Sequence, residues 1–390
     1  MGKRAAIVVL DGVGIGEAPD AAAYGDVGSD TLGHVVGAMA SNQLKNLGEA
    51  GLGNIHAING LPPVISPTAA IGSMSPSAAG KDSTAGHWEI AGVRIVVPFP
   101  TYPGGFPRAL IEQFSARTGR AVIGNAVGSG TDIIAAFGEE HVRTGAWIVY
   151  TSTDSVFQIA AHEDVVPLYE LYAGCEIARA ILVPPNDVSR VIARPFVGKD
   201  GAFRRTANRR DFSVVPSSET LLDALAAAGI ERSGVGKVDD LFAGRSIRSQ
   251  HTSGNAEGIH LIQRWLLSAE DTGFLFANLV DFDQLYGHRN DVPGFFGALR
   301  EFDAALPALR RALREEDLLF ITADHGNDPT TASSDHAREN VPLLAFGPAV
   351  RAGIGIGQRG TFADLGATVA DWFGLSFRGV GTSFLAQIIH

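Results

Sequence analysis

Residues 318–328 read Leu318-Leu319-Phe320-Ile321-Thr322-Ala323-Asp324-His325-Gly326-Asn327-Asp328. The short, continuous apolar run at the start of this stretch is typical of a buried strand in a parallel sheet. Gly326 allows the chain to leave the strand directly after the adjacent Asp–His pair. In open α/β sheets, the carboxyl ends of the strands are the usual place for functional sites. The stretch therefore predicts a site at a sheet edge; the alternative is an aspartate that caps a helix beside a surface histidine.

The same pattern recurs elsewhere in the chain. Residues 5–10 form an apolar run that ends at Asp11, and residues 274–280, apolar except for Asn278, form a second strand-like run that leads into Asp283. If these strands are parallel, the side chains that follow them meet at one edge of the sheet. The set comprises three carboxylates and three imidazoles: Asp11, Asp283, His288, Asp324, His325 and His336.

A mixed set of carboxylates and imidazoles indicates divalent ions of the Mn²⁺ or Zn²⁺ kind. Ligation by oxygen alone would indicate Mg²⁺ or Ca²⁺, and thiolates would indicate structural zinc. Two ions about 4 Å apart can stabilise the attacking and leaving oxygens of an in-line phosphoryl transfer. The six residues therefore predict a two-metal centre, although any one of them alone is more often structural. We expect the nearby acids Asp281, Asp328 and Asp335 to support or cap rather than bind metal.

Two hydroxyl residues lie at the predicted start of a helix. Ser83 and Thr84 directly follow Gly80-Lys81-Asp82. This is not a phosphate-binding P-loop, because Asp82 follows the lysine and Ser75 stands where the first glycine is required. Backbone N–H groups at a helix N-terminus nevertheless favour an anion such as an alkoxide or a phosphoryl group. The alternative interpretation is an ordinary Ser/Thr helix cap.

Predicted strands and helices alternate before residue 98 and after residue 216, whereas the segment between them has a different sequence pattern. The alternation predicts an α/β core, residues 1–97 and 217–390, with a mainly parallel sheet and helices on both faces. Residues 98–216 begin with closely spaced prolines and predict an inserted, smaller α+β domain. Within the core, we expect residues 60–80 to be loop and residues 235–238 to be strand.

The inserted segment contains the basic run Arg204-Arg205-Thr206-Ala207-Asn208-Arg209-Arg210. Such a run is most often a solvated face. In an acidic protein with candidate metal ligands elsewhere, the alternative is a clamp for one phosphate, since arginine offers bidentate contacts.

The bulk composition excludes several classes of protein. With 390 residues, 45% hydrophobic and 19% charged, the chain is ordinary globular protein. Its net charge of -11 disfavours a general nucleic-acid binder but is compatible with a small anionic substrate. No apolar run is long enough to predict a membrane span or the core of a signal peptide. The single cysteine, Cys175, fits a reducing compartment, so we expect the cytoplasm. Nothing in the sequence indicates the oligomeric state.

Longer motifs lie in order along nearly the whole chain. They are Asp11-Gly12-Val13-Gly14-Ile15-Gly16-Glu17-Ala18-Pro19-Asp20, Gly80-Lys81-Asp82, Gly86-His87-Trp88-Glu89, Arg194-Pro195-Phe196-Val197-Gly198, Leu279-Val280-Asp281-Phe282-Asp283, Gly287-His288-Arg289 and Thr322-Ala323-Asp324-His325-Gly326-Asn327-Asp328. In sequence and order these motifs resemble the phosphopentomutase family of the alkaline-phosphatase superfamily. The resemblance implies an alkaline-phosphatase-like core and a mobile inserted cap that recognises a sugar phosphate.

The resemblance also implies a division of the ligands. Three residues, Asp11, Asp324 and His325, would bind one Mn²⁺, and the other three, Asp283, His288 and His336, would bind a second; Zn²⁺ or another divalent ion is the alternative. The family's nucleophile is the hydroxyl directly after Gly-Lys-Asp, here Ser83, which would carry the phosphoryl group as phosphoserine. The family commonly has threonine at this position and another hydroxyl residue where Ala85 stands, so Thr84 is an alternative nucleophile.

The implied reaction interconverts ribose 1-phosphate or 2-deoxyribose 1-phosphate with the 5-phosphate. Glucose 1,6-bisphosphate or a similar bisphosphate would prime the phosphoenzyme. The implied substrate contacts are Asp154, Arg190, Ile192, Arg194, Arg205, Asn208, Arg209 and Lys237.

Four alternatives compete with this interpretation. A metal-dependent phosphatase or phosphodiesterase of the same superfamily would share the metals and the hydroxyl but would let water attack. A cofactor-independent phosphoglycerate mutase is expected to have a longer chain and a different cap. A mutase for a modified pentose phosphate would show much the same motifs. A metal-binding protein without turnover would have no need for Ser83 or for the basic insertion.

Overall fold

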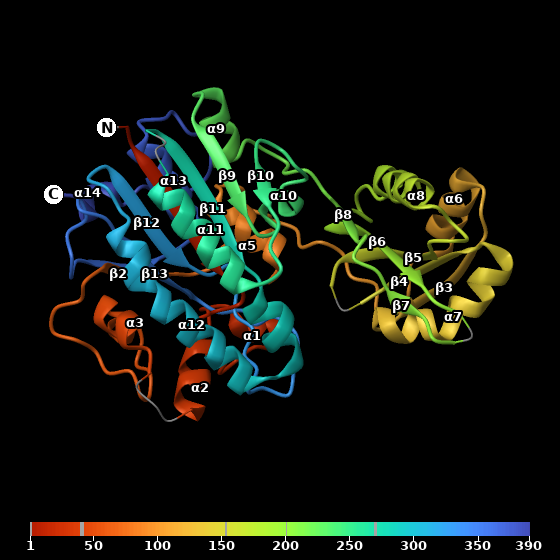
Figure 1. The fold of residues 1–390 in the computed structure, drawn as a ribbon, viewed down its shortest axis with the longest axis horizontal. Helices are drawn as coiled ribbons and strands as arrows, with labels where there is room; N and C mark the ends of the chain where they lie inside the picture. Colours follow the sequence, from red (N-terminus) through yellow and green to blue (C-terminus); the bar gives the residue numbers. More distant parts are fainter. Residues whose placement is uncertain (1, 40–42, 153, 200, 269–270) are drawn as a thin grey trace. The chain divides into compact units, whose positions relative to one another are not determined.

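The computed structural model describes residues 2–39, 43–152, 154–199, 201–268 and 271–390. The chain forms two compact units (Figure 1). The first consists of Met1–Val97 together with Pro216–His390, and the second of Pro98–Val215. Each unit is built around a sheet of its own.

The sheet of the first unit has eight strands in the order β10-β9-β11-β1-β12-β13-β2-β14. Their bounds are β1 Arg4–Leu10, β2 Ala70–Met74, β9 Glu231–Val235, β10 Arg248–Gln250, β11 Gly273–Leu279, β12 Asp317–Thr322, β13 Val341–Phe346 and β14 Gly355–Arg359. The strands β10, β9, β11, β1 and β12 are mutually parallel, whereas β13 is antiparallel to both of its neighbours. The predicted mainly parallel sheet is confirmed.

Three central strands place the candidate site. Every residue of β1, β11 and β12 is buried, so both faces of the sheet are covered, as their continuous apolar sequences predict. Because these strands are parallel, the segments that follow them leave at the same edge. Strand β13 runs the opposite way, so the loop that precedes it lies at this edge too. That loop contains His336.

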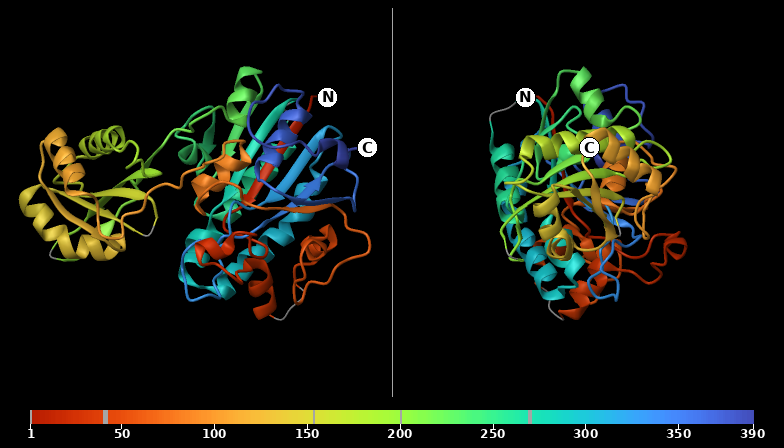
Figure 2. Two further views of the ribbon diagram at one scale, coloured as in Figure 1. Left: turned by 180° about the vertical axis from the view of Figure 1, so that it is seen from behind. Right: turned by 90° about the vertical axis from the view of Figure 1, so that its right-hand side faces the viewer.

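The helices of the first unit pack in two groups. Helix α11 packs on β11 and against α12, and the red helices α2 and α3 lie beside α12 in both Figure 1 and Figure 2. Helix α13 packs against α5 and α9. The bounds are α1 Ala21–Tyr24, α2 Thr31–Ala38, α3 Lys45–Ala50, α4 Leu52–Ile55, α5 Ser83–Ile90, α9 Leu221–Ala227, α10 Val238–Leu241, α11 Asn255–Leu267, α12 Val292–Arg311, α13 Ala363–Trp372 and α14 Leu385–Ile388. A π-helical turn, Phe282–Tyr286, and a 3-10 turn, Gly287–Arg289, follow β11.

The second unit has a six-stranded sheet in the order β3-β4-β5-β6-β7, with β8 also paired to β6. The elements are β3 Val122–Val127, β4 Trp147–Thr151, β5 Val156–His162, β6 Arg190–Val197, β7 Arg204–Arg205, β8 Arg210–Ser213, α6 Arg108–Thr118, α7 Gly130–Thr144 and α8 Leu168–Ile181. One apolar cluster joins α6 and α8 to the sheet through Phe114, Trp147 and Phe157. A smaller cluster joins α7 to the sheet through Ile134 and Ile148. The helices of this unit therefore pack against its sheet through two separate apolar clusters.

Two local predictions are wrong. Residues 60–80 are not all loop, because residues 70–74 form β2 between β13 and β14. The pairing partners come from far along the chain, so tertiary contacts override the local Pro, Ser and Gly signal. The strand predicted at residues 235–238 ends at Val235: Gly236 has a φ of 84°, and Val238 begins α10. A positive φ is incompatible with a continuing strand.

Among the described residues, no helix is both long and apolar enough to cross a lipid bilayer.

A buried ion pair lies at the end of the first sheet opposite the candidate site, where β1 and β12 begin. Arg4 Nε and Nη2 donate to the two carboxylate oxygens of Asp317 at 2.8 and 2.5 Å, and Nη2 also donates to the Leu266 carbonyl at 2.9 Å. Arg4 is 0% exposed and Asp317 is 2% exposed. We expect Asp317→Ala to lower the free energy of unfolding of the first unit by about 3–5 kcal/mol, because it leaves a buried guanidinium unpaired. Urea denaturation measures the change.

The control is Glu112→Ala, which removes the exposed partner of Arg108 at 2.6 Å. Exposed pairs of this kind contribute about 0–1 kcal/mol. An equal effect of the two substitutions would contradict the assignment of Arg4 and Asp317 as a stabilising pair.

Candidate metal centre

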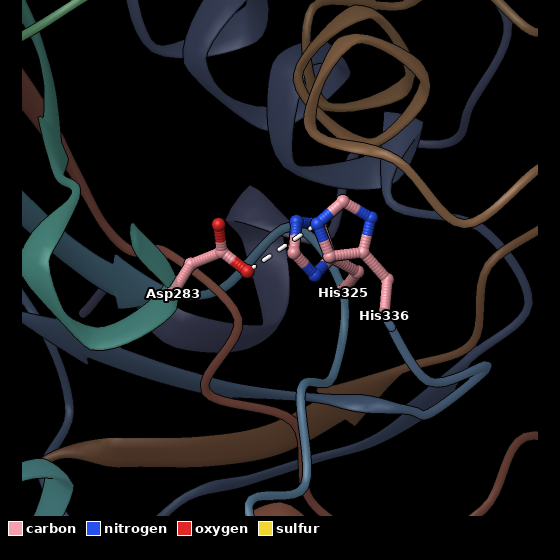
Figure 3. A group of neighbouring side chains, drawn as sticks. All are labelled: Asp283, His325 and His336. Atoms are coloured by element: carbon pink, nitrogen blue, oxygen red, sulfur yellow. Dashed lines mark ion pairs between the residues drawn. The ribbon is translucent and has the colours of Figure 1, made fainter. Parts of the chain in front are cut away.

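Five of the six predicted ligands form two groups at the carboxyl edge of the first sheet; the sixth, His288, is in neither group but lies beside Asp283. Asp11, Asp324 and His325 each offer a ligand atom, and these atoms lie within 4.8 Å of one another. Asp283, His325 and His336 form a second such group (Figure 3). His325 therefore belongs to both groups, whereas the resemblance assigned it to one. All five residues are buried.

The first group is held by the ends of β1, β11 and β12. His325 Nε2 lies 3.3 Å from Asp11 Oδ1 and 3.4 Å from Asp324 Oδ2. The backbone N–H of Gly12 donates to Asp324 Oδ1 at 3.1 Å, and Asn278 Nδ2 donates to Asp11 Oδ2 at 2.8 Å. These donors orient both carboxylates and leave their remaining oxygens facing the imidazole.

Asp283 organises the second group. Its Oδ1 lies 3.3 Å from His336 Nε2 and accepts a hydrogen bond from Asn327 Nδ2 at 2.7 Å. Its Oδ2 lies 3.2 Å from Nε2 of the half-buried His288. His288 Nδ1 lies 2.7 Å from the Ser334 carbonyl. A hydrogen bond there places the proton on Nδ1 and leaves Nε2 as the ligand atom, the usual arrangement of a metal-binding histidine.

The buried charges shift the pKa values of these groups. Burial raises the pKa of Asp11, and the Asp324 carboxylate raises it further. Burial also opposes ionisation of Asp283, but the imidazole of His336 outweighs it and holds the pKa of Asp283 well below its ordinary value. Burial disfavours the imidazolium of His325, yet Asp324 and Asp11 raise its pKa well above its ordinary value. A divalent cation among these groups would displace such a proton and neutralise the carboxylates.

The donor set fits a divalent metal. Among the described residues, no hydrogen bond of normal geometry reaches the buried atoms Asp324 Oδ2, His336 Nε2 and Asn327 Oδ1, although His87 Nδ1 lies 3.1 Å from Asp324 Oδ2. Buried polar atoms are normally paired, so their shared position among carboxylates and imidazoles is explained by coordination to a cation. The predicted supporting acids have other partners: the side chain of Asp281 accepts from Asn255 N, that of Asp328 from Thr330 N, and that of Asp335 from His336 N.

Ser83 lies directly beside the first group. It is the first residue of α5, whose N-cap Asp82 accepts hydrogen bonds from Thr84 N at 3.0 Å and Ala85 N at 3.1 Å. Ser83 Oγ is 3.1 Å from His325 Nε2 and 3.5 Å from Asp11 Oδ1. Thr84, one position further round the helix, is 1% exposed. Successive helix residues project about 100° apart, so the two hydroxyls cannot face the same group at once.

Sequence reasoning gave no role to His87, which joins the helix of Ser83 to a candidate ligand. His87 Nδ1 is 2.9 Å from the Ser83 carbonyl and 3.1 Å from Asp324 Oδ2, and the residue is 0% exposed. We expect His87→Ala to weaken Mn²⁺ binding about 10- to 100-fold, because Asp324 loses a neighbour that orients it. Titration calorimetry of the metal-free protein measures the affinity.

The matched control is His141→Ala in the second unit, another 0% exposed histidine with hydrogen bonds to backbone groups at Ala146 and His162. It should leave Mn²⁺ affinity unchanged. Equal losses in both variants would show that the effect comes from general destabilisation.

The implied substrate contacts are divided between the units. Arg190, Ile192 and Arg194 alternate along β6, so they share one face of the second sheet. Arg194 Nε donates to Gln158 at 2.9 Å. Lys237 belongs to the first unit, where its Nζ donates to Gln284 Oε1 at 2.6 Å.

The remaining implied contacts lie near the β7–β8 turn and the β4–β5 turn. Arg209 pairs with Asp211 through two contacts of 2.7 Å, and Asn208 Nδ2 donates to Glu163 at 3.0 Å. Arg205 is in β7 and is exposed. Asp154 lies just before β5.

A buried tyrosine that sequence reasoning did not single out faces these arginines. Tyr150 is 1% exposed, and burial raises the pKa of its hydroxyl, although the charges of Arg194, Arg205 and Arg209 lower it. Burial, together with Arg209, lowers the pKa of Arg194 to about 10. A side chain at Gly130, the first residue of α7, would lie 2.4 Å from Arg205 Nη2 and 2.5 Å from Tyr150 Oη. Several arginine side chains and the N-terminus of α7 therefore lie near Tyr150, an arrangement that favours the binding of an anion.

The fold and the site together define a metalloenzyme. Residues 3–377 match the model of the Metalloenzyme superfamily, and the chain belongs to this superfamily and, within it, to the phosphopentomutase family. It is 53% identical over 387 residues to the phosphopentomutase of Caldanaerobacter subterraneus subsp. tengcongensis, covering 99% of this chain and 98% of the relative. It is 54% identical over 388 residues to that of Dictyoglomus thermophilum, with the same coverage.

A solved structure supports the fold independently. The phosphoglycerate mutase of Leishmania mexicana superposes with a TM-score of 0.50 at 12% identity, covering 100% of this chain and 98% of that one. The predicted alkaline-phosphatase-like fold is thereby confirmed.

Proposed function

We propose that this protein is a phosphopentomutase that moves a phosphoryl group between the 1- and 5-hydroxyls of ribose or 2-deoxyribose. The observation that supports this most is the position of Ser83, whose Oγ lies 3.1 Å from His325 Nε2 beside two groups of buried metal-type ligands. In a chain that is 53% identical to a named phosphopentomutase over nearly its whole length, that hydroxyl is the natural acceptor of the phosphoryl group.

The proposed ligands for two Mn²⁺ ions are Asp11, Asp324 and His325 for one, and Asp283, His288 and His336 for the other. Bound divalent ions would lower the pKa of the Ser83 hydroxyl and balance charge on the phosphoryl oxygens. The protein itself mainly positions the reacting groups, which is what phosphoryl transfer requires. Helix α5 presents Ser83 at its N-terminus, where backbone N–H groups and the helix dipole favour the anionic phosphoryl group.

The proposed cycle begins with a phosphoserine. A bisphosphorylated sugar such as glucose 1,6-bisphosphate would prime the enzyme: Ser83 Oγ bonds to its phosphorus, and a sugar hydroxyl is released. The phosphoserine then donates its phosphoryl group to the free hydroxyl of a pentose phosphate, and the resulting bisphosphate rebinds with its other phosphate at Ser83. The Ser83 oxygen accepts that phosphate, and the isomeric pentose phosphate leaves.

We propose residues 98–216 as the cap that recognises the pentose phosphate, with 1–97 and 217–390 as the catalytic core. The convergence of Arg194, Arg205, Arg209 and the N-terminus of α7 around Tyr150 supports a phosphate site in the cap. A cap is chemically useful because a mutase must keep water from hydrolysing its phosphoserine. We also propose a cytoplasmic location, which the unpaired, buried Cys175 supports.

One substitution tests the role of the cap. We expect Arg205→Ala to raise the KM for ribose 5-phosphate about 10- to 100-fold, because one charge-assisted hydrogen bond to phosphate contributes about 1.5–3 kcal/mol. Steady-state kinetics give KM. The control is Arg117→Ala, which removes another exposed arginine of the same unit from α6. An unchanged KM in Arg205→Ala would argue against a phosphate contact there.

The function is tested with Mn²⁺-loaded protein, ribose 5-phosphate and a trace of glucose 1,6-bisphosphate. Ribose 1-phosphate and free phosphate are followed together, and 2-deoxyribose 5-phosphate is run in parallel. The proposal predicts isomeric product with little free phosphate. Free phosphate as the main product would instead indicate a phosphatase, and absence of any transfer would indicate a metal-binding protein without this activity.

A further inference from the structure

One buried arginine holds the loop that leads to Ser83. Arg338 Nη1 donates to the carbonyls of Ala78 at 2.8 Å and Gly80 at 2.6 Å, and Nη2 donates to the carbonyl of Pro76 at 3.2 Å. Nε and Nη2 also donate to the two carboxylate oxygens of Asp20 at 3.0 and 2.9 Å. The side chain is 3% exposed. These carbonyls lie outside helix and strand, so Arg338 supplies partners that secondary structure does not.

The N–H groups of the same loop are held from the other side by Glu89. This residue of α5 is 0% exposed. Its carboxylate accepts from Ser77 N at 2.9 Å and from Ala78 N at 2.8 Å. The loop is therefore fixed through its N–H groups by the helix that carries Ser83, and through its carbonyls by Arg338.

Arg338 also links this loop to the segment that contains a candidate ligand. It follows His336 by two residues, and its backbone N–H donates to Asp26 Oδ2 at 2.8 Å. Asp26 pairs in turn with Lys81 Nζ at 3.0 Å, two residues before Ser83. The guanidinium lies over the ring of Tyr24, 4.5 Å from its centroid. One set of contacts thus connects the loop that precedes Ser83 to the segment that follows His336.

We propose that Arg338 is a positioning residue that aligns Ser83 with the metal centre. The inference rests on the proposed function. Only a planar guanidinium has enough fixed donors to reach three carbonyls and both oxygens of one carboxylate. The ammonium of a lysine would leave several of these acceptors, the buried Ala78 carbonyl or the half-buried carbonyls of Pro76 and Gly80 among them, without a donor, so the loop would shift. A displacement of about 1 Å in a reacting group can cost about 100-fold in rate.

The test compares Arg338→Lys and Arg338→Met with Arg4→Lys. Arg4 is the matched control, because it too is buried, binds a carboxylate through two nitrogens and donates to a backbone carbonyl, that of Leu266 in α11, but at the opposite edge of the sheet. We expect kcat for ribose 5-phosphate to fall about 10- to 100-fold in Arg338→Lys and further in Arg338→Met, with KM and Mn²⁺ affinity within about threefold of wild type. Arg4→Lys should lose stability but keep kcat per folded molecule.

A second measurement does not depend on activity. Amide hydrogen exchange of the peptide covering residues 76–83, in metal-free protein, should be faster in both Arg338 variants and unchanged in Arg4→Lys. Unchanged kcat and unchanged exchange would overturn the proposal. A loss of kcat that parallels a loss of Mn²⁺ affinity would overturn it as well, because Arg338 would then act on His336. If wild type formed no isomeric product, the proposed function would fail, while the exchange data would still decide whether Arg338 holds the loop.

Discussion

Ser83→Ala is expected to abolish mutase activity, lowering kcat by about 10⁴-fold or more, because the phosphoryl group loses its covalent acceptor. The hydroxyl that is removed lies 3.1 Å from His325 Nε2 and 3.5 Å from Asp11 Oδ1. The substitution deletes one oxygen from a half-buried residue at the start of α5, so the fold should persist. Product formation is followed with ribose 5-phosphate, and intact-mass spectrometry detects the phosphoenzyme.

Thr84→Ala is the natural control, since it removes the neighbouring hydroxyl from the same turn of α5. Thr84 is 1% exposed, and its backbone N–H, which the substitution keeps, donates to Asp82 at 3.0 Å. We expect Thr84→Ala to retain activity within about tenfold and to become phosphorylated on the peptide that contains Ser83. If Thr84→Ala were inactive and Ser83→Ala were phosphorylated, the nucleophile assignment would be wrong, although the fold and the family would stand.

Asp283→Asn is expected to produce the second-largest effect, a loss of at least about 100-fold in both Mn²⁺ affinity and activity. Asp283 is the shared partner of His288 at 3.2 Å and His336 at 3.3 Å. Asparagine keeps the shape of the side chain but removes the negative charge and leaves one neutral amide oxygen where two carboxylate oxygens stood, which makes it a much weaker ligand. Removing a residue that only orients a metal ligand typically lowers metal affinity or activity about 10- to 100-fold. Loss of the charged ligand itself should therefore lower both by at least about 100-fold.

The control for charge removal is Asp303→Asn in α12. Asp303 is 4% exposed and accepts from Leu47 N at 2.7 Å and from Asn46 Nδ2, so it is a buried carboxylate with a structural role. It should lose stability without losing metal affinity. Chelation of wild type by EDTA should reproduce the inactivity of Asp283→Asn, and added Mn²⁺ should restore only the wild type. Normal Mn²⁺ affinity in Asp283→Asn would remove Asp283 from the ligand set.

The central strands could be predicted from sequence because their signal is local. A run such as residues 318–321 has no polar residue to place in solvent, so it must be covered on both faces, and β12 is buried along its whole length. The same reasoning applies to β1 and β11. Once these strands are taken as parallel, Asp11, Asp283 and Asp324 must lie at one edge. The strand β2 could not be predicted this way, because its residues pair only with β13 and β14, which lie far along the chain.

The arrangement within the site depends on long-range contacts. His336 reaches the centre because β13 is antiparallel to β12, a choice that the local sequence does not encode. Gly86 allows α5 to pack against the segment that follows β12: a side chain there would come within 2.2 Å of the Asp324 carbonyl. That packing, together with the capping of α5 by Asp82, turns Ser83 rather than Thr84 toward His325.

The sequence by itself determined the parallel core, the edge at which the candidate ligands gather and the chemical kind of those residues, because strand periodicity and side-chain chemistry are properties of short segments. Only the tertiary structure decided that His325 lies in both ligand groups, that Ser83 faces them and that Arg338 holds the loop before it. Each of these depends on distances between separate segments, some of them more than 200 residues apart, and such distances are set by how strands pair and helices pack rather than by any single stretch.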